Sequence, residues 1–338
     1  GRTASLLERA REPSYRVQAF RTAAAVVDGL DPEQLDLKIR TGTLKDLKGV
    51  GPKTAAVVVQ AHRGEVPDYL VKLEEDLAEL VPMADDVAEF RAALKGDLHL
   101  HSDWSDGGSP IREMAEAAIA LGHEYMALTD HSPRLTVANG LSPARLEQQL
   151  DVVAALNEEL SPFRILTGIE CDINVDGSLD QTEELLGRLD VVVASVHSDL
   201  RADSRAMTER MLTAVANPHA DVLGHCTGRL VIGRRQRNGE QKPRPESTFD
   251  AEAVFAACVE SGTAVEINSR PERLDPPRRL LTLANELGCE FAIDTDAHAP
   301  GQLDWQHNGI ERAIECGVQP DRVVNTRSAE DLLAWTRA

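Results

Sequence analysis

The sequence has no apolar run that approaches the roughly 20 residues needed to cross a bilayer. Its first residues also lack the apolar core of a secretory signal peptide. Of the 338 residues, 42% are apolar and 27% are charged, which is ordinary usage for a soluble globular protein. We therefore expect a cytoplasmic protein with no membrane partner, and the chain length favours about two domains.

Cysteine pairs with the spacing of a structural metal site or a redox motif are absent. The chain has five cysteines, an odd number, with no Cys-x-x-Cys spacing, and most of them lie in or beside apolar segments. We expect reduced, mostly buried thiols at Cys171, Cys226, Cys258, Cys289 and Cys316.

Positive charge is scarce, because 36 Lys and Arg face 56 Asp and Glu, a net charge of −20. This balance argues against a protein that binds nucleic acid over its whole surface. The deficit is uneven: residues 1–63 carry 11 Lys and Arg against 7 Asp and Glu, a net of +4, whereas residues 96–338 carry 22 against 40, a net of −18. Any contact with a phosphate backbone is therefore expected in the N-terminal part.

The N-terminal part shows apolar residues at steps of three and four over residues 6–30, which predicts helices. A Gly-Val-Gly turn follows, and its glycines allow a positive φ and bring backbone N–H groups to a helix N-terminus, where a phosphate can bind. This pattern resembles a helix-hairpin-helix, a motif that grips the DNA backbone; the alternative is a Gly-rich turn between packed helices. The candidate DNA-binding residues are Gly49, Val50, Gly51, Lys53 and Thr54.

From residue 96 onward, short apolar runs alternate with helical stretches, which is typical of β/α units. Seven β segments are expected, starting near residues 97, 125, 165, 191, 221, 263 and 290, with helices near 110–122, 142–160, 204–217, 248–261 and 276–288. The pattern predicts an α/β fold, a distorted seven-stranded TIM-like barrel over residues 96–338. A small all-α domain over residues 1–81 and a linker over 82–95 would precede it.

The candidate site residues lie at the C-terminal ends of the β segments, which is where β/α barrels place their active sites. Six of the ten histidines follow or end an apolar segment, together with carboxylates. Imidazole and carboxylate ligands suit Zn, Mn or Fe, and about nine of them imply two or three divalent ions, with Glu170 as a bridging candidate. The residues at these ends are His99, His101, Asp130, His131, Glu170, His197, His225, Glu266 with Asn268, Asp296 and His298.

Several segments resemble the PHP (polymerase and histidinol phosphatase) superfamily over about residues 96–338. They are Gly96-Asp-Leu-His-Leu-His, Leu128-Thr-Asp-His-Ser, Gly168-Ile-Glu, Ala194-Ser-Val-His-Ser, Leu223-Gly-His and Ile293-Asp-Thr-Asp-Ala-His. Within the superfamily the chain looks closest to the PHP domain of bacterial family X DNA polymerases. The N-terminal helices are similar to the first domain of the same polymerases.

The resemblance implies a ligand set for three metal ions. His99, His101, Glu170 and Asp296 would hold the first; Glu170, His197 and His225 the second; Asp106, His131 and His298 the third. The polymerase palm is missing between residues 60 and 96, so nucleotidyl transfer is not expected. Related eukaryotic first domains form a Schiff base through a lysine at the position of Val57, so lyase activity is not expected either.

The residues and the resemblance together predict metal-assisted hydrolysis of a phosphate ester. We weigh a 3′-to-5′ exonuclease or 3′-end-processing enzyme of DNA repair, a small-molecule phosphatase of the histidinol-phosphate or nucleotide-monophosphate type, and a non-catalytic DNA-binding module. Phosphate contacts are expected from loop arginines, whose alternative role is solvated charge. Asp130 is expected to orient His131 or to support the ligands from behind. These candidates are Asp130, Arg234, Arg235 and Arg270.

Overall fold

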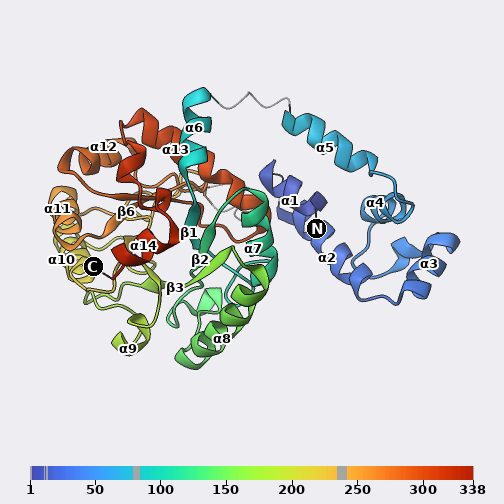
Figure 1. Cartoon of the computed structure of the whole chain (residues 1–338), viewed down its shortest axis with the longest axis horizontal. Coiled ribbons are helices and arrows are strands. Elements are labelled where there is room, and N and C mark those ends of the chain that lie inside the picture. Colours follow the sequence, from blue (N-terminus) through green and yellow to red (C-terminus); the bar gives the residue numbers. More distant parts are fainter. Residues whose placement is uncertain (1, 11, 13, 79–83, 234–241, 338) are drawn as a thin grey trace. The chain divides into compact units, whose positions relative to one another are not determined.

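The computed structural model describes residues 2–10, 12, 14–78, 84–233 and 242–337. The chain divides into two compact units, Gly1–Met83 and Ala84–Ala338, which are described separately (Figure 1). Within the described ranges, no helix has the length and apolar character of a membrane span. All five cysteines are free, and four of them are buried.

The first unit is built of helices alone in its described part. Asp31 caps α3 by accepting a 2.8 Å hydrogen bond from the Glu33 N–H, and Gly42 ends that helix with a φ of 68°. Small apolar clusters hold the helices together, one around Leu7 and another around Leu44. The elements are α1 (Arg2–Arg9), α2 (Ser14–Asp28), α3 (Pro32–Thr41), η1 (Leu44–Asp46), α4 (Pro52–His62) and α5 (Asp68–Ala78).

The turn expected at residues 49–51 lies directly before α4. Gly49 has a φ of 93°, and a Cβ there would come within 2.7 Å of the Thr22 Cγ2, so only glycine fits. Gly51 is the N-cap residue of α4, and its N–H donates to the Thr54 Oγ1 at 2.9 Å. Val50 is buried in the small core. These four residues therefore build the turn from which α4 starts.

The second unit begins with α6 (Asp85–Ala93), which lies in the segment expected to be a linker. Val87 and Phe90 stand three positions apart on one face of this helix, and both are buried in the main core of the unit. The helix packs against α13 (Gln306–Glu315). Residues 85–93 therefore belong to the outer helical layer of the barrel.

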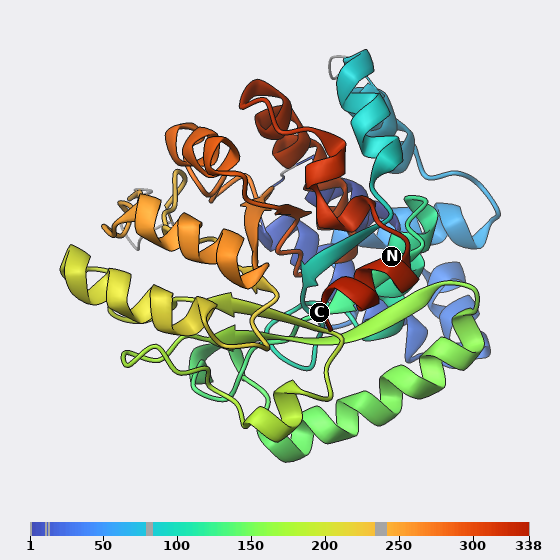
Figure 2. The same cartoon turned by 60° about the vertical axis from the view of Figure 1, so that its left-hand side comes forward.

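Seven parallel strands follow one another around the sheet in the order of the sequence. They are β1 (Gly96–Leu100), β2 (Tyr125–Leu128), β3 (Arg164–Asp172), β4 (Val191–Ser195), β5 (Val222–Leu223), β6 (Ala264–Asn268) and β7 (Phe291–Asp294). Helices connect them: α7 (Ile111–Ala120), α8 (Pro143–Leu160), α9 (Glu183–Leu186), α10 (Ser204–Val215), α11 (Ala251–Ser261) and α12 (Arg278–Leu287). Figure 2 shows these helices around the strands, so the predicted barrel is confirmed.

The first and last strands meet in a seam that closes the barrel. One backbone bridge joins Leu100 to Ala297. Side-chain hydrogen bonds also join the two strands. Asp97 Oδ2 accepts a 2.5 Å hydrogen bond from the Thr295 hydroxyl, and Asp294 Oδ1 accepts one of 2.8 Å from a backbone N–H of β1. Buried carboxylates thus take the place of a continuous ladder between β1 and β7.

The last segment of the chain closes the N-terminal end of the barrel. Helix α14 (Ala329–Trp335) adds Leu332 and Leu333 to the apolar cluster that also holds Leu98. The Tyr125 hydroxyl at the start of β2 donates to the Arg327 carbonyl at 3.1 Å. With this end filled by apolar side chains, the polar cluster of the barrel lies at the opposite, C-terminal ends of the strands.

A pH-dependent stability difference is expected at Asp221, which leads into β5. Its Oδ2 accepts a 2.7 Å hydrogen bond from the Val192 N–H, and burial raises its pKa to about 8. The folded state therefore binds more protons than the unfolded state up to that pH, so this group lowers stability as pH rises toward about 8. Asp221→Asn keeps an acceptor without the charge, and should lose less melting temperature between pH 6 and 9 than the original protein. Equal losses in thermal scans would contradict this.

Candidate metal centre

Nine side chains named from the sequence meet at the C-terminal ends of the barrel strands. His99 and Glu170 lie within β1 and β3, and the others follow β1, β2, β4, β5 and β7. Every one of the nine belongs to a group of potential ligand atoms that lie within 4.8 Å of one another. The four groups are His99, His101 and Asp296; His99, Glu170 and His225; His131, Glu170 and His197; and His101, Asp106, His131 and His298.

Glu170 occupies the middle of this cluster and is 1% exposed. Both of its carboxylate oxygens face imidazole nitrogens contributed by four other strand ends. Oε1 lies 2.8 Å from His225 Nε2 and 3.2 Å from His197 Nε2, and Oε2 lies 2.8 Å from His131 Nδ1, 3.4 Å from His99 Nε2 and 3.6 Å from His101 Nε2. A carboxylate in this position can bridge two cations.

Asp106 stands at the outer side of the cluster and is more accessible than Glu170. Its Oδ1 lies 3.4 Å from His131 Nε2 and 3.3 Å from His298 Nε2. The His101 ring lies between these two histidines, with ring centroids 4.4 Å and 4.3 Å away. The candidate ligands therefore form one continuous cluster.

Two of the candidate ligands have a left-handed backbone. The φ angle is 21° at His225 and 52° at Asp296, a region that non-glycine residues seldom adopt. The Asp296 carboxylate accepts a 2.8 Å hydrogen bond from Arg273 Nε and one of 3.3 Å from Arg270 Nη1. Such strain concentrates at functional sites, where the surrounding contacts hold it.

The electrostatics differ between members of the cluster. Burial lowers the pKa of His99, His131 and His197, but nearby carboxylates outweigh it and raise all three pKa values above the ordinary value. Glu170 and His101, by contrast, are held in the forms that bind cations. Burial alone would raise the pKa of Glu170, but the charge of neighbouring histidines holds it well below its ordinary value. Burial, together with His298 and His131, holds the pKa of His101 well below its ordinary value. An ionised carboxylate therefore stands beside a neutral imidazole, and both are states that metal binding requires.

Several buried atoms of these side chains make no hydrogen bond within the described part of the chain. They are His99 Nε2, both ring nitrogens of His101, Glu170 Oε2, His197 Nε2 and His225 Nδ1. Buried polar atoms are rarely left unsatisfied, because each one costs desolvation energy. Imidazole nitrogens and carboxylate oxygens are ligands for Zn, Mn or Fe, so the residues present fit divalent ions.

Two carboxylates lie behind the histidines, and the sequence did not predict which histidine either of them contacts. Glu266 Oε1 lies 2.5 Å from His99 Nδ1, and Asp172 Oδ1 lies 3.1 Å from His197 Nδ1. The signal for Asp172 was its position two residues after Glu170 on the same strand, which places both side chains on one face. Glu266 was found at a strand end, but nothing in the sequence pairs it with a particular histidine.

The four candidates for catalytic support or phosphate contacts differ in where they lie. Among the described residues Asp130 has no histidine partner: its carboxylate accepts from the Ser102 N–H and hydroxyl at 2.9 and 2.6 Å, from the Ser105 hydroxyl, and from Gln149 at 2.7 Å. It therefore anchors the loop after β1 instead of orienting His131. Arg270 does reach the cluster, with Nη1 3.1 Å from His298 Nδ1. Arg234 and Arg235 lie outside the described residues.

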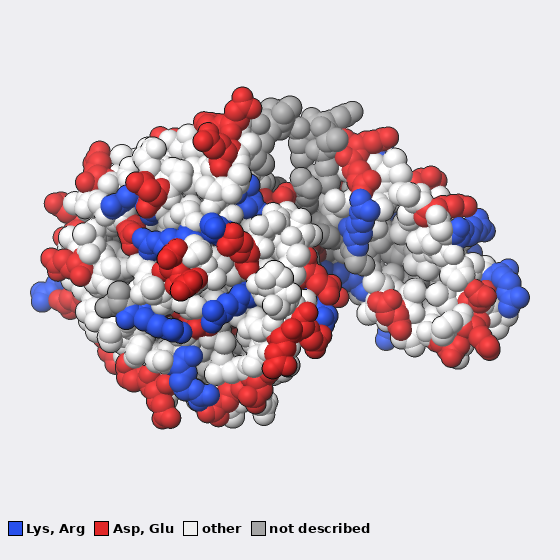
Figure 3. All heavy atoms as spheres, in the orientation of Figure 1, with Lys and Arg blue, Asp and Glu red and all other residues white. Residues whose placement is uncertain are grey.

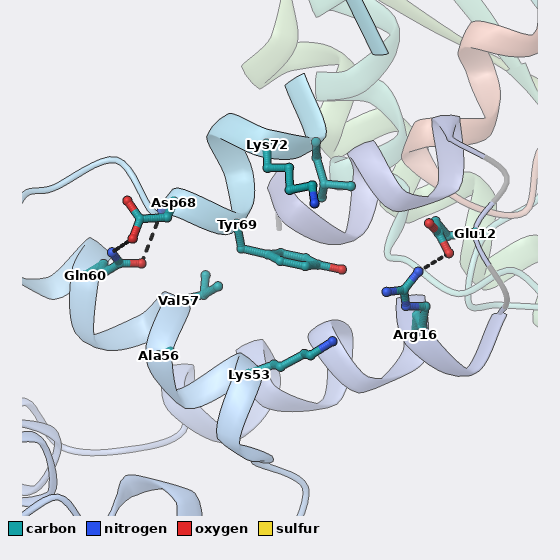
Figure 4. A pocket seen from close by; sticks show the side chains of 10 residues that line it. Glu12, Arg16, Lys53, Ala56, Val57, Gln60, Asp68, Tyr69 and Lys72 are labelled. Atoms are coloured by element: carbon teal, nitrogen blue, oxygen red, sulfur yellow. Dashed lines mark hydrogen bonds and ion pairs between the residues drawn. The ribbon is translucent and has the colours of Figure 1, made fainter. Parts of the chain in front are cut away.

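The first unit holds a cavity of about 610 Å³ along α4 and α5. Lys53 and Lys72 reach into it from two helices, with the Tyr69 hydroxyl between them (Figure 4). Arg16 also lines it and pairs with Glu12. Within the described ranges neither lysine forms an ion pair. Of the five candidate DNA-binding residues, Lys53 alone lines this cavity, and the other four build the adjacent turn.

Comparison with known proteins gives the chain its family. The model of the PHP domain matches residues 97–270. Over 72% of its length the chain is 43% identical to the DNA polymerase/3′-5′ exonuclease PolX of Bacillus subtilis, of which the match spans 41%. It is 27% identical over 68% of its length to a probable phosphatase of Thermoanaerobacter, of which the match spans 89%.

A solved structure, the histidinol phosphate phosphatase of Lactococcus lactis with zinc, L-histidinol and phosphate, matches 66% of the chain and 92% of its own, at 21% identity and a TM-score of 0.45. The family assignment comes from the domain match, which covers half of the chain and contains seven of the nine clustered side chains. The chain belongs to the PHP domain family.

Proposed function

We propose that the barrel unit hydrolyses phosphate esters with two or three divalent metal ions, and that its substrate is the 3′ end of DNA. The observation that carries this is the convergence of nine imidazole and carboxylate side chains around Glu170 at the open end of the barrel. The relative from Bacillus subtilis, named as a polymerase and 3′-5′ exonuclease, supports DNA as the substrate. The chain spans less than half of that relative.

The nine side chains would hold the ions in the sets that the cluster brings together. His99, His101 and Asp296 form one, and His225 joins His99 at Glu170. His131 and His197 reach Glu170 from another side, and Asp106 with His298 forms the outermost set. Bound ions of this kind lower the pKa of a water toward about 7 and stabilise charge on the phosphate. Glu170 contributes a negative charge that both inner sets share.

Arg270 is the protein group best placed to orient the ester. It lies two residues after the end of β6, is partly exposed, and brings Nη1 within 3.3 Å of Asp296 Oδ1 and 3.1 Å of His298 Nδ1. A guanidinium offers paired N–H donors that match phosphate oxygens. In the proposed mechanism Arg270 binds the phosphate at the edge of the metal cluster, while the carboxyl group of Asp296 stays fixed by Arg273 at 2.8 Å.

His101→Ala tests the proposal, because His101 lies between the inner and outer ligand sets. A 5′-labelled DNA primer, single-stranded and annealed, is digested in the presence of Mn. The original protein is expected to give a ladder shortening from the 3′ end, and the variant to lose at least about a hundredfold in rate, since each 1.4 kcal/mol of lost stabilisation is tenfold. His219→Ala is the matched control, because His219 lies outside the cluster. Intact primer in every lane would refute a DNA exonuclease.

A small-molecule phosphatase is the second candidate. The observation in its favour is that the Thermoanaerobacter relative named as a probable phosphatase is matched over 89% of its own length. The match covers 68% of this chain. Release of phosphate from histidinol phosphate and nucleotide monophosphates distinguishes the two functions. Turnover of these esters with intact primer favours the phosphatase. Less than one metal equivalent per chain, with no ester hydrolysed, would leave a non-catalytic DNA-binding module.

The first unit is proposed to hold the DNA end. Lys53 stands in the first turn of α4, and Lys72 faces the same cavity from α5 (Figure 4). Replacing both lysines by alanine should weaken DNA binding uniformly across sequences, and reduce the slope of log affinity against log salt by about 1 per lost phosphate contact. Fluorescence anisotropy at several salt concentrations measures this. Arg40→Ala, on α3 and outside the cavity, is the control; an unchanged slope in the double variant would contradict the proposal.

A further inference from the structure

We propose that Glu266 is a positioning residue that fixes the tautomer of His99 and the backbone of His225, so that two ligands from different strands present their lone pairs to one metal ion. The inference rests on the proposed function and extends it to a residue outside the nine ligands. Glu266 lies on β6, fully buried, and it is a member of none of the groups that could hold an ion within the described part of the chain.

The two oxygens of Glu266 serve two strands. Oε1 lies 2.5 Å from His99 Nδ1, and Oε2 accepts a hydrogen bond of 2.5 Å from the His225 N–H. The Asn268 side-chain amide donates to the same Oε2 at 3.2 Å. In the neutral form of His99, which is the form that binds a metal ion, a carboxylate oxygen that accepts at Nδ1 places the single ring proton there.

This tautomer determines which ring nitrogen of His99 is free to bind a metal ion. With the proton on Nδ1, Nε2 carries a bare lone pair, and it lies 3.4 Å from Glu170 Oε2 without a hydrogen bond. Two lone pairs that face each other in a buried site repel, and a bound cation would remove the repulsion. The opposite tautomer would place a proton on Nε2 and block ligation there.

The contact to His225 explains why one side chain holds two ligands. His225 has a φ of 21°, and its N–H points to Glu266 instead of to a strand neighbour. The His225 ring in turn reaches Glu170 Oε1 at 2.8 Å through Nε2. Glu266 thus stabilises the left-handed backbone conformation of His225, and this conformation orients the His225 ring toward Glu170.

Asp172 shows the same geometry for a single ligand. Its Oδ1 lies 3.1 Å from His197 Nδ1 and accepts the His197 N–H at 3.2 Å, while His197 Nε2 points to Glu170. Histidine ligands commonly donate their second ring N–H to a carboxylate, which fixes the ring and raises its basicity. Glu266 differs because it spans two strands.

Glu266→Gln is the sharpest variant, since it keeps the size of the side chain. His99 and His225 face different oxygens of Glu266, and an amide replaces one of these oxygens by an N–H₂ donor, so one of the two contacts loses its acceptor. Zinc affinity is measured by competition with a chromophoric chelator on the full chain. The variant is expected to bind zinc about 10- to 100-fold more weakly than the original protein. Asp221→Asn, also a carboxylate-to-amide change but at the far end of β5, is expected to bind zinc unchanged.

A second readout is independent of activity and of affinity. In the zinc-loaded protein labelled with ¹⁵N-histidine, long-range ¹H–¹⁵N correlations report the tautomer of each ring. We expect His99, assigned by its loss in His99→Gln, to carry its proton on Nδ1. A proton on His99 Nε2, or equal zinc affinity in Glu266→Gln and the original protein, would overturn the inference. If the original protein bound no zinc and no other divalent ion, the proposed function itself would fall.

Discussion

Glu170→Gln is expected to remove nearly all metal-dependent hydrolysis, a loss of at least about three orders of magnitude in kcat. The carboxylate faces five imidazole rings, and both of its oxygens stand between ligand sets. An amide removes the negative charge that two ions would share and turns a donor toward nitrogens that must act as ligands. Because each factor of ten corresponds to about 1.4 kcal/mol, three orders need only about 4 kcal/mol of lost stabilisation.

Metal content and hydrolysis are measured together for this variant. Glu170→Gln should retain its fold, because its backbone N–H and neighbours on β3 stay paired, but it should bind fewer ions per chain than the original protein. Glu286→Gln, on the exposed face of α12, is the matched control with unchanged activity. Full metal content together with full activity in Glu170→Gln would contradict the proposed role of the Glu170 carboxylate as a shared metal ligand.

Removal of divalent ions is expected to lower the melting temperature of the barrel by about 10 °C. An ion that binds the folded state alone stabilises it by about 3 to 4 kcal/mol at 100 to 1,000 times its dissociation constant. For a unit of this size each kcal/mol moves the melting temperature by about 2 to 4 °C. Thermal scans after dialysis against a chelator, and again after adding zinc or manganese, measure the shift.

Two comparisons separate specific binding from general effects of the chelator. Glu170→Gln should show a much smaller shift on loading than the original protein, because it lacks the shared ligand. His219→Ala should show the full shift, since its ring lies outside the cluster. Identical melting temperatures for the loaded and stripped original protein would contradict a metal centre in this cluster.

The barrel was predictable from sequence because short apolar runs and helical stretches alternate clearly, and all seven strands lie where the runs predicted them. The convergence of the nine side chains was predictable for a related reason: parallel strands in a barrel end at one face, so residues at those ends must meet. His99 and Glu170, for instance, lie more than seventy positions apart in the printed sequence yet are 3.4 Å apart.

What the sequence did not predict depends on side-chain direction and loop geometry. Asp130 directly precedes His131, yet its carboxylate turns to Ser102 and Gln149, because adjacent residues at a strand end face opposite sides. Glu266 pairs with His99 only because β6 and β1 curve toward the same centre. Residues 85–93 looked like a linker because the segment is acidic, whereas Val87 and Phe90 bury one face of α6.

The contacts between β1 and β7 close the barrel, and the same closure brings the candidate metal ligands together. His99 and His101 come from the first strand, and Asp296 with His298 from the end of the last one. During synthesis the first of these residues leave the ribosome long before their counterparts, and the barrel cannot shut until Asp97 meets Thr295. A nascent or truncated chain that stops before β7 therefore carries most of the ligands but no enclosed centre, so the proposed hydrolytic activity would require a barrel that is nearly whole.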